Sequence, residues 1–168
     1  MAQIKITSKG DGAQAFPKDL VRREPPKTGR KEGVQNVKKI LLIDDEEVVR
    51  SVVGEILKRA GYWVQTAADG KSGLELFQRD EFDLLITDLL MPETDGLETI
   101  MALRRQRKSM KIMAISGCGL TLGGEYLKIA EHLGADITLA KPFTQASLLT
   151  AVASLLGSPS QTPFAPAG

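Results

Sequence analysis

The sequence predicts an α/β domain in which a parallel β-sheet is covered by helices on both faces. Five short apolar segments alternate along the chain with five segments of helical hydrophobic periodicity. Strand–helix units repeated in this way favour an open parallel sheet with right-handed crossovers. Three of the apolar segments are almost continuously hydrophobic, as strands buried on both faces usually are.

The five apolar segments have the length of strands rather than helices. The first, KILLID, and the third, DLLITD, both end in an aspartate, and the fourth, KIMAIS, ends in a serine. The expected strands are residues 39–44, 63–67, 83–88, 111–116 and 137–140.

The segments between these strands carry apolar residues at i, i+3 and i+4, the spacing of an amphipathic helix. The first helix is expected to stop at Gly61, and the last to begin at Thr144, a residue type that caps helix N-termini. The other three are expected at about 71–79, 97–107 and 125–133. The apolar positions of the first helix are Val48, Val49, Val52, Val53, Ile56, Leu57 and Ala60.

The composition is that of a globular protein, with 42% hydrophobic and 26% charged residues. The single cysteine, Cys118, cannot form an internal disulfide and is either a small loop residue or a redox-sensitive thiol. The sequence has no apolar run of the length needed for a transmembrane helix or a signal peptide. We therefore expect a cytoplasmic protein without a transmembrane segment.

Two tails flank a domain that we expect at residues 37–157. Residues 1–36 are rich in Lys, Gly and Pro without periodicity, which predicts a disordered leader. Residues 1–39 carry ten Lys and Arg against four Asp and Glu, although the whole chain has a net charge of +1. This basic leader is either a solvated segment or one that meets nucleic acid, anionic lipid or an acidic partner. Residues 158–168 are small, polar and Pro-rich, which predicts a disordered tail.

Chemically active side chains stand where the expected strands end. They are Asp44 and Asp45 after the first strand, Asp88 after the third, Ser116 after the fourth and Lys141 after the fifth. Taken singly, such residues are usually helix caps, turn formers or loop residues. In open parallel sheets, however, ligands bind beyond the carboxyl ends of the strands. The sheet would therefore bring three carboxylates, a hydroxyl and an ammonium group to one pocket.

Three carboxylates that meet in one pocket repel one another and require a cation. Mg²⁺ takes oxygen ligands, carboxylates among them, and leaves room for phosphate oxygens. With the metal bound and the lysine nearby, the pocket suits a phosphoryl group, which an aspartate can accept as a nucleophile. The residues thus indicate Mg²⁺-assisted phosphoryl transfer to a carboxylate.

The segments ILLIDDEE, LLITDLLMPETDG, IMAIS and TLAKPF resemble the motifs of bacterial two-component response regulator receiver domains, and of the stand-alone chemotaxis receivers among them. The resemblance extends over residues 38–156. It implies a flavodoxin-like (βα)5 fold, whose five-stranded parallel sheet has the strand order 2-1-3-4-5.

The resemblance also implies a metal site. Asp45 and Asp88 resemble the family's Mg²⁺ ligands, and Asp44 resembles the acidic residue that acts mainly through bound water. The backbone carbonyl of Leu90 would supply a further ligand.

The resemblance assigns the phosphoryl chemistry to three residues. Asp88 resembles the phosphoacceptor, and Ser116 the switch hydroxyl that moves to hydrogen-bond the phosphoryl group. Lys141 resembles the lysine that pairs with this group, and its bond to Pro142 is expected to be cis.

Some positions depart from the family's pattern. Three residues before the lysine, where relatives often have Tyr or Phe, this sequence has Thr138, so we do not expect the usual aromatic switch. The stretch from Ser116 to Lys141 is a few residues longer than usual, and the excess falls in GCGLTLGG, which is either a mobile loop or a passive insertion. Leu90 and Cys118 stand where rapidly dephosphorylating relatives have polar residues, which predicts slow loss of phosphate.

The resemblance implies a signalling module and not an enzyme, phosphorylated by a histidine kinase or a histidine phosphotransfer protein. About a dozen residues follow Leu156, too few for a DNA-binding domain, so we expect a stand-alone receiver that contacts a downstream protein or relays phosphate. The charge-free last helix is either a docking face or a weakly solvated surface. The alternatives are a phosphorylation-independent docking module and an Asp-nucleophile phosphatase. Leu89 and Leu90 argue against a phosphatase, because such enzymes usually have a second acid two residues after the nucleophile.

Overall fold

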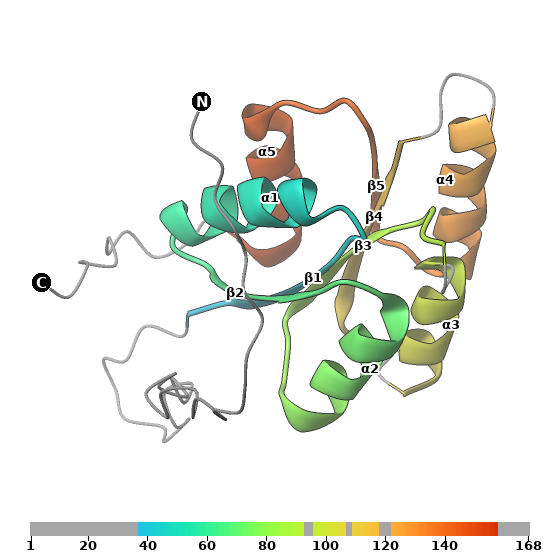
Figure 1. Ribbon diagram of the computed structural model, residues 1–168, viewed down its shortest axis with the longest axis horizontal. Helices are drawn as coiled ribbons and strands as arrows, with labels where there is room; N and C mark the ends of the chain where they lie inside the picture. The colour runs from blue at the N-terminus through green and yellow to red at the C-terminus, as the bar shows by residue number, and fades with distance from the viewer. Residues whose placement is uncertain (1–36, 93–95, 107–108, 118–121, 158–168) are drawn as a thin grey trace, which may run out of the picture. The chain divides into compact units, whose positions relative to one another are not determined.

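A computed structural model describes residues 37–92, 96–106, 109–117 and 122–157, and these form an alternating β/α domain (Figure 1). The strands are β1 (Lys39–Ile43), β2 (Trp63–Ala67), β3 (Leu84–Asp88), β4 (Lys111–Ser116) and β5 (Ile137–Ala140). The helices are α1 (Glu47–Arg59), α2 (Gly70–Arg79), α3 (Gly96–Gln106), α4 (Leu122–Leu133) and α5 (Gln145–Leu156). The expected α/β class is confirmed, whereas the predicted leader, the predicted tail and Cys118 lie outside the described residues.

The strands form one parallel sheet in the order β2-β1-β3-β4-β5. This is the flavodoxin-like order that the family resemblance implies. Every residue of β3 is buried, as are four of the five residues of β1, because helices cover both faces of these central strands. The carboxyl ends of β1, β3 and β4 therefore lie side by side at one edge of the sheet.

The helices form two layers around the sheet (Figure 1). Helices α1 and α5 cover one face, where Leu57 and Val152 pack with Leu42 of β1. Helices α2, α3 and α4 cover the other face, where Phe77 and Leu103 belong to a second hydrophobic core. Successive residues of a strand point to opposite layers, so β1 to β4 contribute to both cores, whereas β5 contributes Ile137 and Leu139 to the core under α1 and α5.

The bounds of most elements agree with the predictions to within one residue, but α4 does not. It begins at Leu122, three residues before the predicted start at Glu125. The prediction excluded two glycines that α4 includes in its first turn. Glycine is a poor helix former in isolation, but propensity is a weak prior that tertiary context overrides.

Helix α1 buries a narrower face than its apolar residues suggested. Val53 and Leu57 are buried, but Val48 is 74% exposed and Val52 is 53% exposed. A helix that lies on one face of a sheet can bury only one stripe of its surface. Some of the seven apolar positions counted from the sequence therefore face solvent.

At the amino ends of β4 and β5, hydrogen bonds of Arg104 and Asp136 connect α3 with the sheet. Asp136 accepts hydrogen bonds from the backbone N–H of Ile112 at 2.9 Å, from Arg104 Nη2 at 2.6 Å and from Lys111 Nζ at 3.1 Å. Arg104 Nε also donates to the Gly134 carbonyl at 2.9 Å. Burial by itself would raise the pKa of Asp136, but these hydrogen bonds outweigh it and hold the pKa below its usual range.

We expect Asp136→Asn to reduce the free energy of unfolding at neutral pH by about 1–2 kcal/mol, because the amide loses charge-assisted bonds. The pKa of Asp136 in the folded protein lies below the usual value of 3.8. The contribution of its carboxylate to the free energy of unfolding is therefore fully present above pH 3.8, and it is lost as the pH falls through the pKa of the folded protein. Urea unfolding of wild type and variant should therefore differ at neutral pH and converge in acid. A Glu75→Gln control, at an exposed position of α2, should have the same free energy of unfolding as wild type at neutral pH. A difference between Asp136→Asn and wild type that stayed constant down to acidic pH would contradict the prediction.

In the part of the chain that the structure describes, no helix has both the length and the apolar character needed to cross a membrane.

Candidate functional site

The acidic residues after β1 lie in a short loop that hydrogen bonds hold in place. Asp44 is buried, and its backbone N–H donates to the carbonyl of Ala67 in β2 at 3.3 Å. Its Oδ1 accepts from the backbone N–H of Glu46 at 2.9 Å, which folds the loop back on itself. Asp45 is exposed, so the loop presents one buried and one accessible carboxylate.

Asp88 is the last residue of β3, and its side chain is nearly buried, with 5% of the residue exposed. Its Oδ1 accepts from the backbone N–H of Leu90 at 3.0 Å. The next residue, Leu89, donates its N–H to Ile115 of β4 at 2.9 Å, so the sheet's hydrogen bonding continues just past Asp88. Gly96 then donates to the Leu89 carbonyl at 3.3 Å, which closes the connection to α3. Asp88 is thus held at a fixed place on the edge of the sheet.

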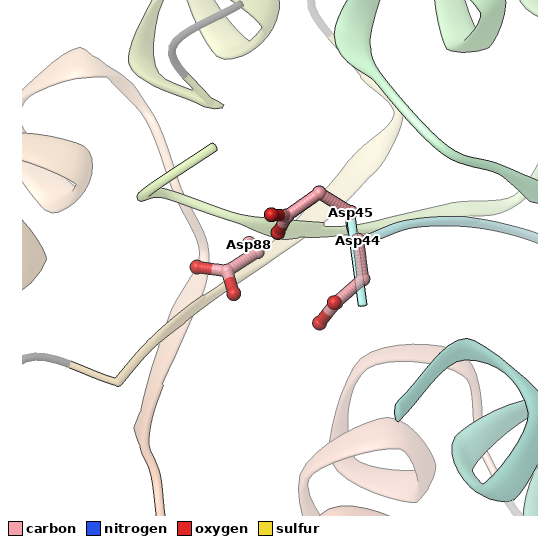
Figure 2. Close-up of side chains that lie close together, drawn as sticks. All are labelled: Asp44, Asp45 and Asp88. Carbon is pink, nitrogen blue, oxygen red and sulfur yellow. The ribbon is translucent and has the colours of Figure 1, made fainter. Parts of the chain in front are cut away.

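The structure brings the three predicted aspartates together. Each of Asp44, Asp45 and Asp88 offers a carboxylate oxygen, and these oxygens lie within 4.8 Å of one another. Figure 2 shows the three side chains gathered in one space at the ends of β1 and β3. This convergence follows from the topology, because β1 and β3 are neighbours although 44 and 88 are far apart in the sequence.

Lys141 supplies the positive charge of the site. Its Nζ lies 2.6 Å from Asp88 Oδ2 and 2.9 Å from Asp44 Oδ2, and 3.9 Å from Glu46 Oε1. The predicted cis bond between Lys141 and Pro142 is present. The ammonium group therefore connects the end of β5 with the ends of β1 and β3.

Burial and charge compete in the site's pKa values. Burial raises the pKa of Asp44 above its usual range, and Lys141 offsets only part of that shift. Burial by itself would lower the pKa of Lys141, but its hydrogen bonds and charge interactions with Asp88 and Asp44 raise the pKa instead. The lysine is therefore fully protonated at neutral pH.

Ser116 ends β4 on the same edge. It is 1% exposed, and among the described residues its Oγ has no hydrogen-bond partner. A buried hydroxyl without a partner is costly, so such atoms usually mark a place where a ligand or water binds. Backbone pairing of Ser116 with Ala140, next to Lys141, places this hydroxyl beside the lysine's strand.

These residues fit a hard divalent cation together with an anion. The cluster of three carboxylates has one close ammonium group, which pairs with Asp44 and Asp88, so negative charge remains that a cation such as Mg²⁺ would offset. The exposed position of Asp45 leaves the cluster accessible. The carbonyl of Leu90 remains a predicted ligand.

Thr138, at the family's usual aromatic position, bonds to α4. Its Oγ1 donates to Glu131 Oε1 at 2.8 Å. In the sheet Thr138 pairs with Ala114, two residues before Ser116 on β4. A hydrogen bond to α4 therefore stands at the position where relatives often have an aromatic ring.

Sequence reasoning missed one residue that touches the acidic loop. Arg50, in the first turn of α1, donates from Nη1 to the carbonyls of Asp44 and Asp45. The only available signal was a basic residue one helical turn after an acidic loop, and that pattern alone does not distinguish this contact from a solvated arginine.

Comparisons with known proteins agree with the geometry. The family model for the response regulator receiver domain matches residues 40–153. Among curated proteins, the chain is 37% identical over 120 residues to the transcriptional regulatory protein CpxR of Escherichia coli, covering 70% of this chain and 49% of that protein. It is 33% identical over 120 residues to the alkaline phosphatase synthesis transcriptional regulatory protein PhoP of Bacillus subtilis, covering 71% and 48%. The chain thus spans about half the length of the curated relatives it matches.

Two solved structures match this fold over nearly their whole length. Chemotaxis protein CheY4 of Vibrio cholerae, crystallised at low pH, is 33% identical with a TM-score of 0.65, covering 71% of this chain and 99% of that one. The receiver domain of NtrX from Brucella abortus is 28% identical with a TM-score of 0.66, covering 70% and 97%. With the acidic cluster, the lysine and the buried serine all at one edge of a 2-1-3-4-5 sheet, this chain belongs to the response regulator receiver domain family.

Proposed function

We propose that this receiver domain accepts a phosphoryl group on Asp88 in a Mg²⁺-dependent reaction, from a histidine kinase or a histidine phosphotransfer protein. The observation that supports this most directly is the position of the Asp88 carboxylate, which is nearly buried and lies 2.6 Å from Lys141 Nζ and beside two further carboxylates. A carboxylate in such a setting is a fixed nucleophile with a cation ready to meet an incoming anion.

In the proposed reaction, a carboxylate oxygen of Asp88 attacks phosphorus. The P–N bond of a phosphohistidine, or the P–O bond of an acyl phosphate, breaks, and its electron pair leaves with the donor. Lys141 Nζ neutralises charge on the phosphoryl oxygens, and Ser116 Oγ donates a hydrogen bond to one of them. Mg²⁺, held by Asp45, Asp88 and the Leu90 carbonyl, with Asp44 acting through bound water, would offset the remaining negative charge.

The proposed role is signalling and not turnover. Leu90 is apolar and packs partly buried against the core that α2, α3 and α4 cover, so it cannot align a water molecule for attack on the acyl phosphate. We therefore propose slow loss of phosphate, with output through a downstream protein or a phosphorelay. The curated relatives are named as transcriptional regulators, and about half of their length lies beyond the region they share with this chain.

Intact mass spectrometry after incubation with acetyl phosphate tests the proposal. Wild type should gain one phosphoryl group with Mg²⁺ present and none with EDTA, and Asp88→Ala should gain none. Asp80→Ala, which changes an aspartate at the end of α2, should behave as wild type. After removal of acetyl phosphate, the added mass should persist for minutes and not seconds. Wild type that binds Mg²⁺ but gains no mass, from acetyl phosphate or from a phosphorylated histidine kinase, would favour a phosphorylation-independent docking module.

A further inference from the structure

We infer that Arg50 is a positioning residue that orients the carboxylates of Asp44 and Asp45 for Mg²⁺. The inference rests on the proposed function, because it concerns the same Mg²⁺-dependent site. Arg50 Nη1 donates to the backbone carbonyl of Asp44 at 2.6 Å and to that of Asp45 at 2.8 Å. Hydrogen bonds from a charged donor are roughly twice as strong as neutral ones, so this pair is a firm link between α1 and the loop.

Two successive carbonyls that share one donor fix the orientation of both peptide planes. Because the peptide unit is planar, fixing these planes also sets the direction in which the Asp45 side chain leaves the backbone between them. The loop's other close contacts act on the Asp44 side chain, whose Oδ1 accepts from the Glu46 N–H at 2.9 Å and whose Oδ2 lies 2.9 Å from Lys141 Nζ. Glu46, the N-cap of α1, makes no side-chain cap bond, and the Asp44 N–H reaches Ala67 at a long 3.3 Å. Among these contacts, the two Arg50 bonds are the ones that hold the backbone carbonyls of both Asp44 and Asp45.

Arg50 and Lys141 contact different groups of the acidic residues. Lys141 contacts the carboxylate oxygens of Asp44 and Asp88. Arg50, in the described part of the chain, donates to backbone carbonyls and forms no ion pair with those carboxylates. Its positive charge is thus brought close to the acidic loop without occupying the oxygens that a cation needs. An arginine that was merely solvated would not show two bonds to one loop from a single nitrogen.

The experiment measures Mg²⁺ affinity of the full chain by isothermal titration calorimetry. Arg50→Met keeps an unbranched side chain of similar helix propensity but removes the donor, and we expect Mg²⁺ binding to weaken about tenfold, the lower end of the usual effect of losing a residue that orients metal ligands. Arg50→Lys keeps one charged donor and should lose less. The matched control is Lys58→Met, since Lys58 lies two turns along α1 and makes only an exposed ion pair with Glu55.

A second measurement separates positioning from general stability. Hydrogen exchange of metal-free protein should be faster at the Asp45 and Glu46 amides of Arg50→Met, while the thermal midpoint stays close to that of Lys58→Met. If both variants bind Mg²⁺ equally well, the inference is wrong. If Arg50→Met fails to fold, Arg50→Ala, which also removes the donor, decides, and wild-type affinity with wild-type loop exchange in that variant would overturn the inference. Wild type that binds no Mg²⁺ would instead contradict the proposed function.

Discussion

Lys141→Met is expected to slow phosphorylation of Asp88 by at least about 100-fold, the usual effect of removing one preorganised donor from a transition state. The ammonium group lies 2.6 Å from the Asp88 carboxylate, so among the described residues it is the positive charge best placed to neutralise the phosphoryl oxygens. The rate of mass gain with acetyl phosphate at saturating Mg²⁺ measures the effect. Lys128→Met, at an exposed position of α4, is the control. A loss of less than about fivefold would show that Lys141 only stabilises the resting site, because Lys141 would then contribute far less than a preorganised donor does.

The same substitution should also destabilise the metal-free protein at neutral pH. Removing Lys141 leaves the buried Asp44 and Asp88 carboxylates without their charged partner, and we expect a loss of about 2–3 kcal/mol, somewhat below that for a fully buried pair. The pKa of Asp44 is already raised by burial, and loss of Lys141 raises it further. A raised native pKa favours the folded state as the pH falls, so the deficit should shrink in acid and with added Mg²⁺. Urea unfolding across pH, with and without Mg²⁺, measures this.

Gly96→Ala is expected to destabilise the protein by about 3 kcal/mol, at the upper end of the range for overpacking, and to impair phosphorylation as well. A Cβ at this position would lie 2.0 Å from the carbonyl oxygen of Asp88 and 2.8 Å from the Cα of Leu89. Both contacts are with backbone, so a side-chain rotation cannot relieve them. The strand end that carries Asp88 would have to shift. Thermal unfolding and mass gain with acetyl phosphate together test both effects.

Gly54→Ala provides the opposite case within the same protein. Gly54 is buried in α1, but the nearest atom to an added Cβ is the Thr66 methyl at an ordinary 3.8 Å. Alanine is favoured over glycine within a helix by roughly 0.5–1 kcal/mol, so this variant should be more stable than wild type. If Gly96→Ala were as stable as Gly54→Ala, the close approach of α3 to Asp88 would not be a constraint on the site.

Much of the fold and the main site were predictable because they depend on pattern and topology. Continuous apolar runs identify the central strands, and a parallel sheet necessarily gathers its carboxyl ends. Because Asp88 and Lys141 both lie at such ends, the topology by itself predicts that their side chains lie close together. The strand order was not available from periodicity, and came from the family motifs.

Other features depend on side-chain reach and on helix orientation, which spacing does not encode. Whether Arg50 turns toward solvent or toward two carbonyls depends on the path of the loop. Val48 and Val52 follow helical periodicity, yet the orientation of α1 against the sheet leaves them exposed. The partner of Thr138 depends on how α4 lies beside β5, and the early start of α4 was itself missed.

The hydrogen bond between Thr138 and Glu131 links α4 to β5. An aromatic ring in that place would act through its volume over a range of distances, whereas a hydroxyl–carboxylate bond weakens steeply once it is bent or stretched. We therefore expect this hydrogen bond between β5 and α4 to be either made or lost, with few intermediate states. A partner that offered Glu131 its own donor would compete with Thr138 from outside the domain. Binding at α4 and the state of β5 would then influence each other to the same extent, as thermodynamic linkage requires.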